Sequence, residues 1–122
     1  MAKIVIVEDN ELNMRLFSDL LKTKGYQVIE CTEGKKALAV IKKHKPDVVL
    51  MDIQMPEVDG LTVTRMVRET PAVAHTKIIA VTAFAMTGDA ERILKQGCNA
   101  YIAKPISIPT FFKTVDEVLN TP

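Results

Sequence analysis

Apolar residues follow two alternating patterns along the chain. Short continuous apolar runs, typical of strands buried on both faces of a sheet, alternate with segments in which apolar residues recur every three or four positions, as in amphipathic helices. The predicted strands are residues 4–7, 26–31, 48–51, 77–81 and 100–103. The predicted helices run from about residue 10 to 25, 34 to 46, 61 to 70, 88 to 96 and 108 to 119.

This alternation of strands and helices predicts an α/β fold. Strands separated by single helices form βαβ units, which give a doubly wound parallel sheet with helices on both faces and right-handed crossovers. A chain of 122 residues is long enough for one proper core, and it contains no linker, repeat or low-complexity segment. We therefore expect a single (βα)5 domain over residues 1–122.

Composition narrows the classes of function. The 16 basic and 15 acidic residues nearly balance, so bulk charge gives no reason to expect binding to nucleic acid or to a membrane surface. Cys31 and Cys98 are far apart and match no zinc or redox spacing, which favours free thiols in a reducing compartment. The chain begins without a signal peptide, and no apolar run reaches the ~20 residues of a membrane span. We expect a cytoplasmic protein.

The candidate chemistry lies where the predicted strands end. Glu8 and Asp9 follow the first strand, Asp52 the third, Thr82 the fourth and Lys104 the fifth. Taken singly, the acids read as helix caps and the lysine as a surface residue. Because parallel strands end at the same edge of a sheet, however, all five side chains are expected to meet there.

Those five residues suit one reaction. Three clustered carboxylates repel one another unless a cation joins them, and oxygen ligands suit Mg²⁺. With a metal bound, Asp52 can attack a phosphorus atom and form an acyl phosphate. The metal, Lys104 and Thr82 could each take one of its three terminal oxygens. The residues therefore predict a magnesium-dependent phosphoacceptor site.

The chain resembles the receiver domains of two-component response regulators. The resemblance rests on four motifs in the family's order: Val7-Glu8-Asp9-Asn10, Leu50-Met51-Asp52-Ile53-Gln54-Met55-Pro56 with Asp59-Gly60, Val81-Thr82-Ala83, and Ala103-Lys104-Pro105. It implies a flavodoxin-like strand order of 2-1-3-4-5. Glu8 departs slightly from the family's more common pair of aspartates.

The resemblance also implies residue roles. It makes Asp52 the phosphoacceptor, adds the main-chain carbonyl of Gln54 to the metal ligands, and implies a cis peptide bond between Lys104 and Pro105. Thr82 and Lys104 would contact the phosphoryl group, and Tyr101 would turn inward as Thr82 moves. The surface of the fourth helix, fifth strand and fifth helix would change with them.

A narrower likeness concerns the kind of regulator. The stretches Asn10–Asn13, Ala83–Met86 and Lys104–Ser107 resemble DivK-type single-domain regulators of alphaproteobacterial cell division. This implies control of the cell cycle by histidine kinases or phosphotransfer proteins. No output domain follows the last helix, so we expect phosphorylation to act through a downstream protein contact and not through DNA.

Two features of the helices and loops suggest further roles. Apolar residues of the first helix cover about two hundred degrees, more than one core face needs, so Leu12 and Leu16 are candidates for docking a phosphodonor protein. Gln54 and Phe84 lie two positions beyond Asp52 and Thr82, where the resemblance places control of hydrolytic water. Phe84 is therefore expected to shield the acyl phosphate.

Three alternatives remain open. A phosphatase with Asp52 as nucleophile would need an acid two residues further on, where this chain has Gln54. A flavin carrier would need a phosphate loop after the first strand, where Glu8 and Asp9 would repel a phosphate. A receiver cut from a larger hybrid kinase would look the same as a free-standing one.

Overall fold

The structure, a computed structural model, describes residues 2–83 and 89–122. The strands are β1 (Lys3–Val7), β2 (Gln27–Cys31), β3 (Val48–Asp52), β4 (Lys77–Thr82) and β5 (Ala100–Ala103). The helices are α1 (Glu11–Thr23), α2 (Gly34–His44), α3 (Gly60–Arg68), α4 (Asp89–Lys95) and α5 (Ile108–Asn120). Strands and helices alternate as the sequence predicts.

The five strands form one parallel sheet in the order β2-β1-β3-β4-β5. This confirms the predicted order. β3 lies at the centre, and all five of its residues are buried. A strand flanked on both sides and covered on both faces has no solvent-facing position, which explains its continuous apolar run.

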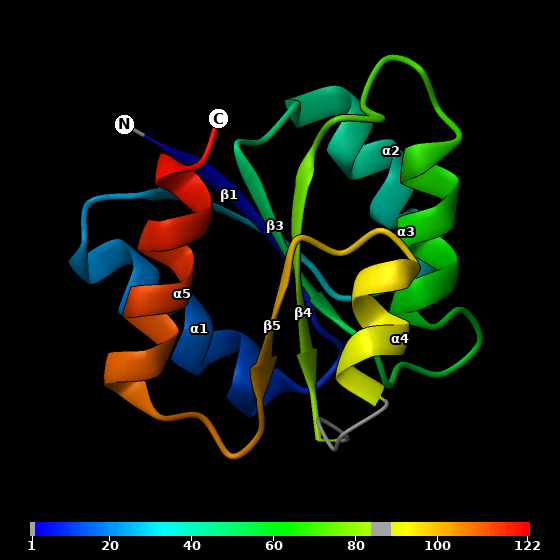
Figure 1. The fold of residues 1–122 in the computed structure, drawn as a ribbon. Coiled ribbons are helices and arrows are strands. Elements are labelled where there is room, and N and C mark those ends of the chain that lie inside the picture. Colours follow the sequence, from blue (N-terminus) through cyan, green and yellow to red (C-terminus); the bar gives the residue numbers. More distant parts are fainter. Residues whose placement is uncertain (1, 84–88) are drawn as a thin grey trace.

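Helices cover both faces of the sheet, with α1 and α5 on one side and α2, α3 and α4 on the other (Figure 1). Alternate strand residues point to opposite faces, so Ile4 and Ile6 join the core under α1 and α5, whereas Val5 and Val7 join the other core. Phe17 of α1 and Phe111 of α5 stack with ring centroids 5.7 Å apart. The doubly wound fold is therefore confirmed.

Two polar side chains begin helices beside the carboxyl ends of the strands. Asn10 Oδ1 accepts the Asn13 main-chain N–H at 2.9 Å, and Asp59 Oδ1 accepts that of Thr62 at 2.9 Å. Each satisfies an N–H that the first turn of a helix leaves without a partner. Together the two caps fix where α1 and α3 begin.

Several element boundaries differ from the sequence prediction by one or two residues, and three of these differences have a clear physical cause. Asp52 and Thr82 are the last residues of β3 and β4, because pairing with the neighbouring strands continues through them. Tyr26 precedes β2: its N–H donates to the Leu21 carbonyl, and its hydroxyl donates to Asp116 Oδ1 at 2.9 Å. The tyrosine thus closes the turn after α1 and does not pair in the sheet.

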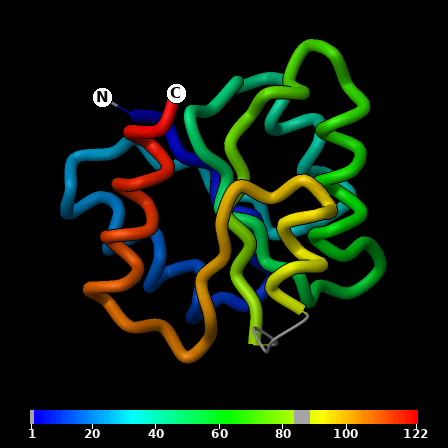
Figure 2. The backbone as a smooth tube through the Cα atoms, in the orientation of Figure 1, coloured from blue at the N-terminus to red at the C-terminus, as the bar shows by residue number. Residues whose placement is uncertain are grey.

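The carboxyl-terminal end of the chain lies beyond the amino-terminal end of the sheet (Figure 2), where Ala2 and Asn120 line the same cavity. Lys77 Nζ at the start of β4 donates a hydrogen bond to the Thr121 carbonyl. The loops at the opposite, carboxyl end are therefore clear of both termini. Within residues 2–83 and 89–122, no helix combines the length and the apolar character needed to cross a bilayer.

Candidate functional site

Three carboxylates meet at the carboxyl end of the sheet. Glu8 and Asp9 follow β1, Asp52 ends β3, and one oxygen from each lies within 4.8 Å of the others. Glu8 and Asp52 are buried, whereas Asp9 is exposed. Adjacent parallel strands bring the three together although 43 positions separate Asp9 from Asp52.

Lys104 lies against two of these carboxylates. Its Nζ is 3.4 Å from Asp52 Oδ1 and 3.6 Å from Glu8 Oε1. Its main-chain N–H donates to the Thr82 carbonyl at 2.8 Å, which fixes the lysine beside the end of β4. The Lys104–Pro105 bond is cis, as the sequence resemblance implies. The single Lys104 ammonium group thus contacts two buried carboxyl groups, and the cluster still holds more acidic groups than basic ones.

Gln54 connects the ends of β3 and β4. Its main-chain N–H donates to Asp52 Oδ1 at 3.2 Å, and its side-chain Nε2 donates to Thr82 Oγ1 at 3.0 Å. The sequence resemblance implies a main-chain ligand role for Gln54 and a part in water access, but it does not predict this link. No residue pattern marks it, because the pairing depends on how the β3–α3 loop folds back over β4.

Gly60 allows helix α3 to begin directly against the phosphoacceptor candidate. A Cβ built at Gly60 would lie 2.3 Å from the Asp52 carbonyl oxygen and 2.9 Å from Met51 Cγ. Any larger residue must therefore displace main chain at the end of β3. The sequence resemblance includes Gly60 in a motif without giving it a role, whereas in the structure its missing side chain lets α3 begin against the end of β3.

Burial disfavours the charged form of Glu8 in the acidic cluster. Desolvation, together with the neighbouring Asp52 carboxyl, raises the pKa of Glu8 to about 7, against an ordinary value of 4.5. Lys104 opposes this shift only in part. Glu8 Oε1 is buried without a hydrogen-bond partner in the part of the chain that the structure describes. The arrangement therefore favours either a proton or a cation at this oxygen.

Raising the pH from 4.5 to 7 without divalent metal is expected to lower the free energy of unfolding through Glu8. Between these values the folded state keeps a proton that the unfolded state has released, so stability falls as the pH rises and then levels off. The loss is about 1–3 kcal/mol for a shift of this size. Urea unfolding in EDTA across this range measures it.

The control for this titration is Glu8→Gln, which removes the ionisable group and keeps the shape. The free energy of unfolding of the variant should not show this fall between pH 4.5 and 7. The difference in unfolding free energy between wild type and variant should therefore become smaller toward pH 4.5. Parallel curves for the two proteins would contradict the assignment of the titration to Glu8.

The remaining predicted residues lie on β5 and α1 or outside the described residues. Tyr101 is in β5 with 37% of its surface exposed, and Leu12 and Leu16 of α1 are 79% and 39% exposed. The wide apolar arc of α1 therefore does leave residues uncovered, as predicted. Phe84 lies outside the described residues.

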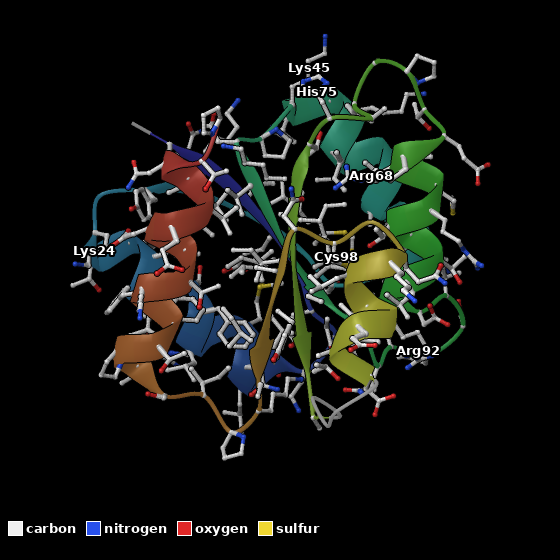
Figure 3. The ribbon with its side chains drawn as sticks, viewed as in Figure 1. Lys24, Lys45, Arg68, His75, Arg92 and Cys98 are labelled. Carbon is white, nitrogen blue, oxygen red and sulfur yellow. The ribbon has the colours of Figure 1, made fainter. Side chains whose placement is uncertain are left out.

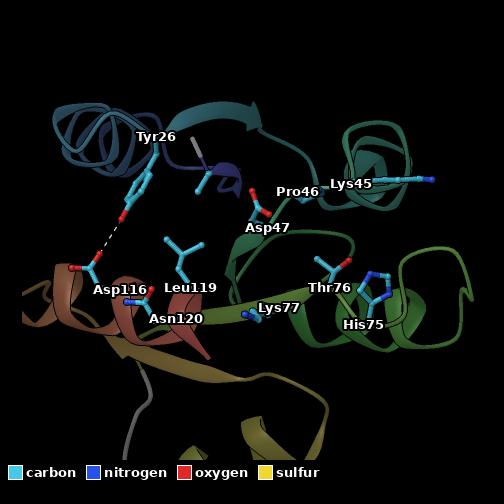
Figure 4. A pocket seen from close by; sticks show the side chains of 11 residues that line it. Tyr26, Lys45, Pro46, Asp47, His75, Thr76, Lys77, Asp116, Leu119 and Asn120 are labelled. Atoms are coloured by element: carbon cyan, nitrogen blue, oxygen red, sulfur yellow. Dashed lines mark hydrogen bonds between the residues drawn. The ribbon is translucent and has the colours of Figure 1, made fainter. Parts of the chain in front are cut away.

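A separate cavity of about 690 Å³ lies at the amino-terminal end of the sheet, lined by residues that include Tyr26, Asp47, His75 and Asp116 (Figure 4). Its two carboxylates already accept hydrogen bonds, Asp47 from the Lys3 main-chain N–H at 2.8 Å and Asp116 from the Tyr26 hydroxyl at 2.9 Å. It is at the opposite end of the strands from Asp52. The carboxylate cluster is therefore the candidate site.

Comparison with known proteins adds independent information. Residues 4–116 match the response regulator receiver domain. The chain is 53% identical over 117 residues to the polar-differentiation response regulator DivK of Brucella anthropi, covering 96% of this chain and 95% of that protein. The DivK protein of Brucella ovis is equally similar, at 53% over the same coverage.

Solved structures of response regulators and receiver domains superpose closely on this chain. The receiver domain of the sensor histidine kinase PA1611 from Pseudomonas aeruginosa, solved with a magnesium ion in its active-site cleft, superposes with a TM-score of 0.90 at 32% identity, covering 98% of each chain. The chemotaxis protein CheY4 of Vibrio cholerae gives 0.90 at 28% identity, covering 97% of this chain and 98% of its own. With a family match over nearly all of its length, this chain belongs to the response regulator receiver domains.

Proposed function

We propose that the chain accepts a phosphoryl group on Asp52 in a magnesium-dependent reaction and signals through altered protein contacts. The observation that carries this proposal is the geometry around Asp52. Its buried carboxylate ends the central strand, lies within 4.8 Å of two further carboxylates and is 3.4 Å from the Lys104 ammonium. Such a site combines a nucleophile with a fixed positive charge.

Each residue then has a defined task. An Asp52 oxygen forms a bond to phosphorus while the bond from phosphorus to the donor nitrogen or oxygen breaks, and the donor keeps that electron pair. Lys104 neutralises part of the charge that develops on the phosphoryl oxygens. The Thr82 hydroxyl would donate a hydrogen bond to the product.

The acidic cluster fits a magnesium ion. The side chains of Glu8, Asp9 and Asp52, with the main-chain carbonyl of Gln54, would hold it. Glu8 Oε1 is buried and has no hydrogen-bond partner among the described residues, and together with the raised pKa of Glu8 this supports a cation at this position. Bound Mg²⁺ would relieve the repulsion among the carboxylates and draw charge from the phosphoryl oxygens. The magnesium recorded in the PA1611 receiver domain supports the same choice of metal.

The biological setting is inferred from the relatives. The Brucella proteins are named polar-differentiation response regulators. The alignment with the Brucella anthropi protein covers 95% of that protein and 96% of this chain. We infer a free-standing receiver domain over residues 1–122 that takes phosphoryl groups from histidine kinases or phosphotransfer proteins in the cytoplasm and controls cell division. It would be a signalling protein and not an enzyme with an external substrate. Tyr101, exposed on β5, would turn inward when Thr82 moves.

Incubation with Mg²⁺ and acetyl phosphate tests the chemistry. Intact-mass spectrometry should show a gain of one phosphoryl group that disappears in EDTA and in Asp52→Asn. A gain that survives in Asp52→Asn would place the chemistry elsewhere, and no gain in the wild-type protein would reject the proposal.

The phosphodonor protein is expected to contact α1. Leu12 and Leu16 expose apolar surface on the helix that begins three residues after Glu8, beside the acidic cluster. Replacing both by lysine should slow phosphotransfer from a protein donor by about tenfold or more, the effect of losing about 1.4 kcal/mol or more of binding. Phosphorylation by acetyl phosphate should be unchanged, because a small donor needs no docking surface.

Met66→Lys is the matched control for this experiment. Met66 is 39% exposed, like Leu16, but lies on α3 across the sheet from α1. It should leave both reactions unchanged. Equal losses with protein and small-molecule donors in the α1 variant would end the docking hypothesis.

A further inference from the structure

The Gln54 side chain joins the two strand ends that phosphorylation must rearrange. Its amide is held at both atoms: Nε2 donates to Thr82 Oγ1 at 3.0 Å, and Oε1 accepts the Ala83 main-chain N–H at 3.4 Å. The Ala83 main-chain N–H can only donate, so it requires the Gln54 amide oxygen as its partner. The amide nitrogen of Gln54 must therefore face Thr82. The same residue also donates its main-chain N–H to Asp52 Oδ1 at 3.2 Å. Gln54 thus contacts both the phosphoacceptor candidate and the switch candidate.

Thr82 and Gln54, the two partners of this hydrogen bond, differ in their burial. Thr82 is 1% exposed, whereas Gln54 is exposed at the surface of the site. The amide therefore lies over the hydroxyl. While Oγ1 accepts this hydrogen bond, the amide is itself held in place by Ala83 and cannot simply follow Thr82 inward.

We propose that Gln54 is a positioning residue that holds Thr82 in the unphosphorylated arrangement and so sets the balance between the two states. This inference rests on the proposed function, in which Thr82 moves to a phosphoryl group on Asp52. That movement breaks the bond between Gln54 Nε2 and Thr82 Oγ1, so the bond stabilises only the resting state. A ligand that binds the active state better must offset that stabilisation.

Removing the amide should therefore favour the active state. Gln54→Met keeps the length of the side chain, deletes both hydrogen bonds and leaves the main-chain carbonyl in place. One hydrogen bond of ordinary net strength corresponds to about a 2- to 10-fold change in an equilibrium constant. In the presence of Mg²⁺, the variant should bind beryllium fluoride, a phosphoryl mimic, about 2- to 10-fold more tightly than wild type.

The test is a double-mutant cycle read by NMR titration with beryllium fluoride. Dissociation constants are measured for wild type, Gln54→Met, Thr82→Val and the double variant, and the Ala83 amide resonance reports the loss of its partner directly. The tightening should occur with Thr82 present and fall below about 2-fold in the Thr82→Val background. Gln27→Met, an exposed glutamine on β2 at the other end of the sheet, should change nothing.

Each remaining outcome overturns the inference. Unchanged or weaker binding by Gln54→Met would mean that the amide does not restrain Thr82. Equal tightening in both backgrounds would mean that it acts by some route other than Thr82. If wild type binds beryllium fluoride and is phosphorylated by acetyl phosphate, such results reject only the role of Gln54. If wild type does neither, the proposed function fails and this inference fails with it.

Discussion

Replacing Arg68 by methionine is expected to lower the free energy of unfolding by about 3–4 kcal/mol. Arg68 lies at the end of α3 (Figure 3). It donates all five of its N–H groups to carbonyl oxygens. The acceptors are the main-chain carbonyls of Ala74, Thr76 and Gly97 and the side-chain carbonyl of Asn99, at 2.6 to 3.0 Å. Methionine fills the space but removes the Arg68 donors from the carbonyls of Ala74, Thr76 and Gly97, whereas Asn99 Oδ1 still accepts the Ile78 main-chain N–H at 2.8 Å.

The size of this effect follows from the number of bonds and from burial. A hydrogen bond to a charged group contributes ~1.5–3 kcal/mol, and the total is less than additive. Burial disfavours the charge and lowers the pKa of Arg68, so part of the gain is offset. Arg68 joins α3 to the loop before β4 and the loop before β5, and no other side chain in the described residues donates hydrogen bonds to both loops.

Urea unfolding measures this prediction, with Arg65→Met as the matched control. Arg65 is on the same helix but is exposed, and its hydrogen bond in the described structure is a long one of 3.4 Å to Thr62. It should change stability by no more than about 0.5 kcal/mol. Arg68→Lys, with three donors on one nitrogen, should fall between the two. A change in Arg68→Met as small as that of Arg65→Met would contradict the structural role.

Gly60→Ala is expected to cost about 2–3 kcal/mol and to impair phosphorylation as well. The added methyl would lie 2.3 Å from the Asp52 carbonyl oxygen, which is main chain and cannot rotate away. Either α3 or the end of β3 must shift, and such overpacking costs ~1–3 kcal/mol. Because Asp52 is the proposed phosphoacceptor, a shift that preserves folding should still slow the reaction with acetyl phosphate.

Gly25→Ala separates this effect from the general cost of losing a glycine. Gly25 has a φ of 81°, and an added Cβ would meet nothing within 4 Å. Its cost should be the left-handed backbone penalty of ~1 kcal/mol, with phosphorylation at the wild-type rate. If Gly60→Ala is phosphorylated as fast as Gly25→Ala, the close approach of α3 does not position Asp52.

Much of the fold could be predicted because local patterns and the global arrangement agree. The apolar run at Val48–Met51 is continuous because β3 is covered on both faces, and the periodicity of α5 follows from one buried face. The boundary at Tyr26 could not be predicted. Its strand-like composition competes with a hydrogen bond to Asp116, 90 positions away.

The carboxylate cluster could be predicted for a topological reason. Parallel strands end at one edge, so Glu8, Asp52 and Lys104 meet wherever their strands are placed correctly. The roles of Arg68, Gly60 and the Gln54 amide could not be predicted, because each depends on loop geometry that no periodicity encodes. Arg68 in particular reads as an ordinary surface charge until its carbonyl partners are seen.

The identity of the residue that carries the phosphoryl group decides whether the proposed function holds. Treatment of the phosphorylated protein with borohydride reduces an aspartyl phosphate to homoserine, and peptide mass spectrometry then locates the changed residue. We predict conversion at Asp52, only after incubation with both Mg²⁺ and acetyl phosphate. Conversion at Glu8, Asp9 or any other acid, with Asp52 intact, would contradict the central claim.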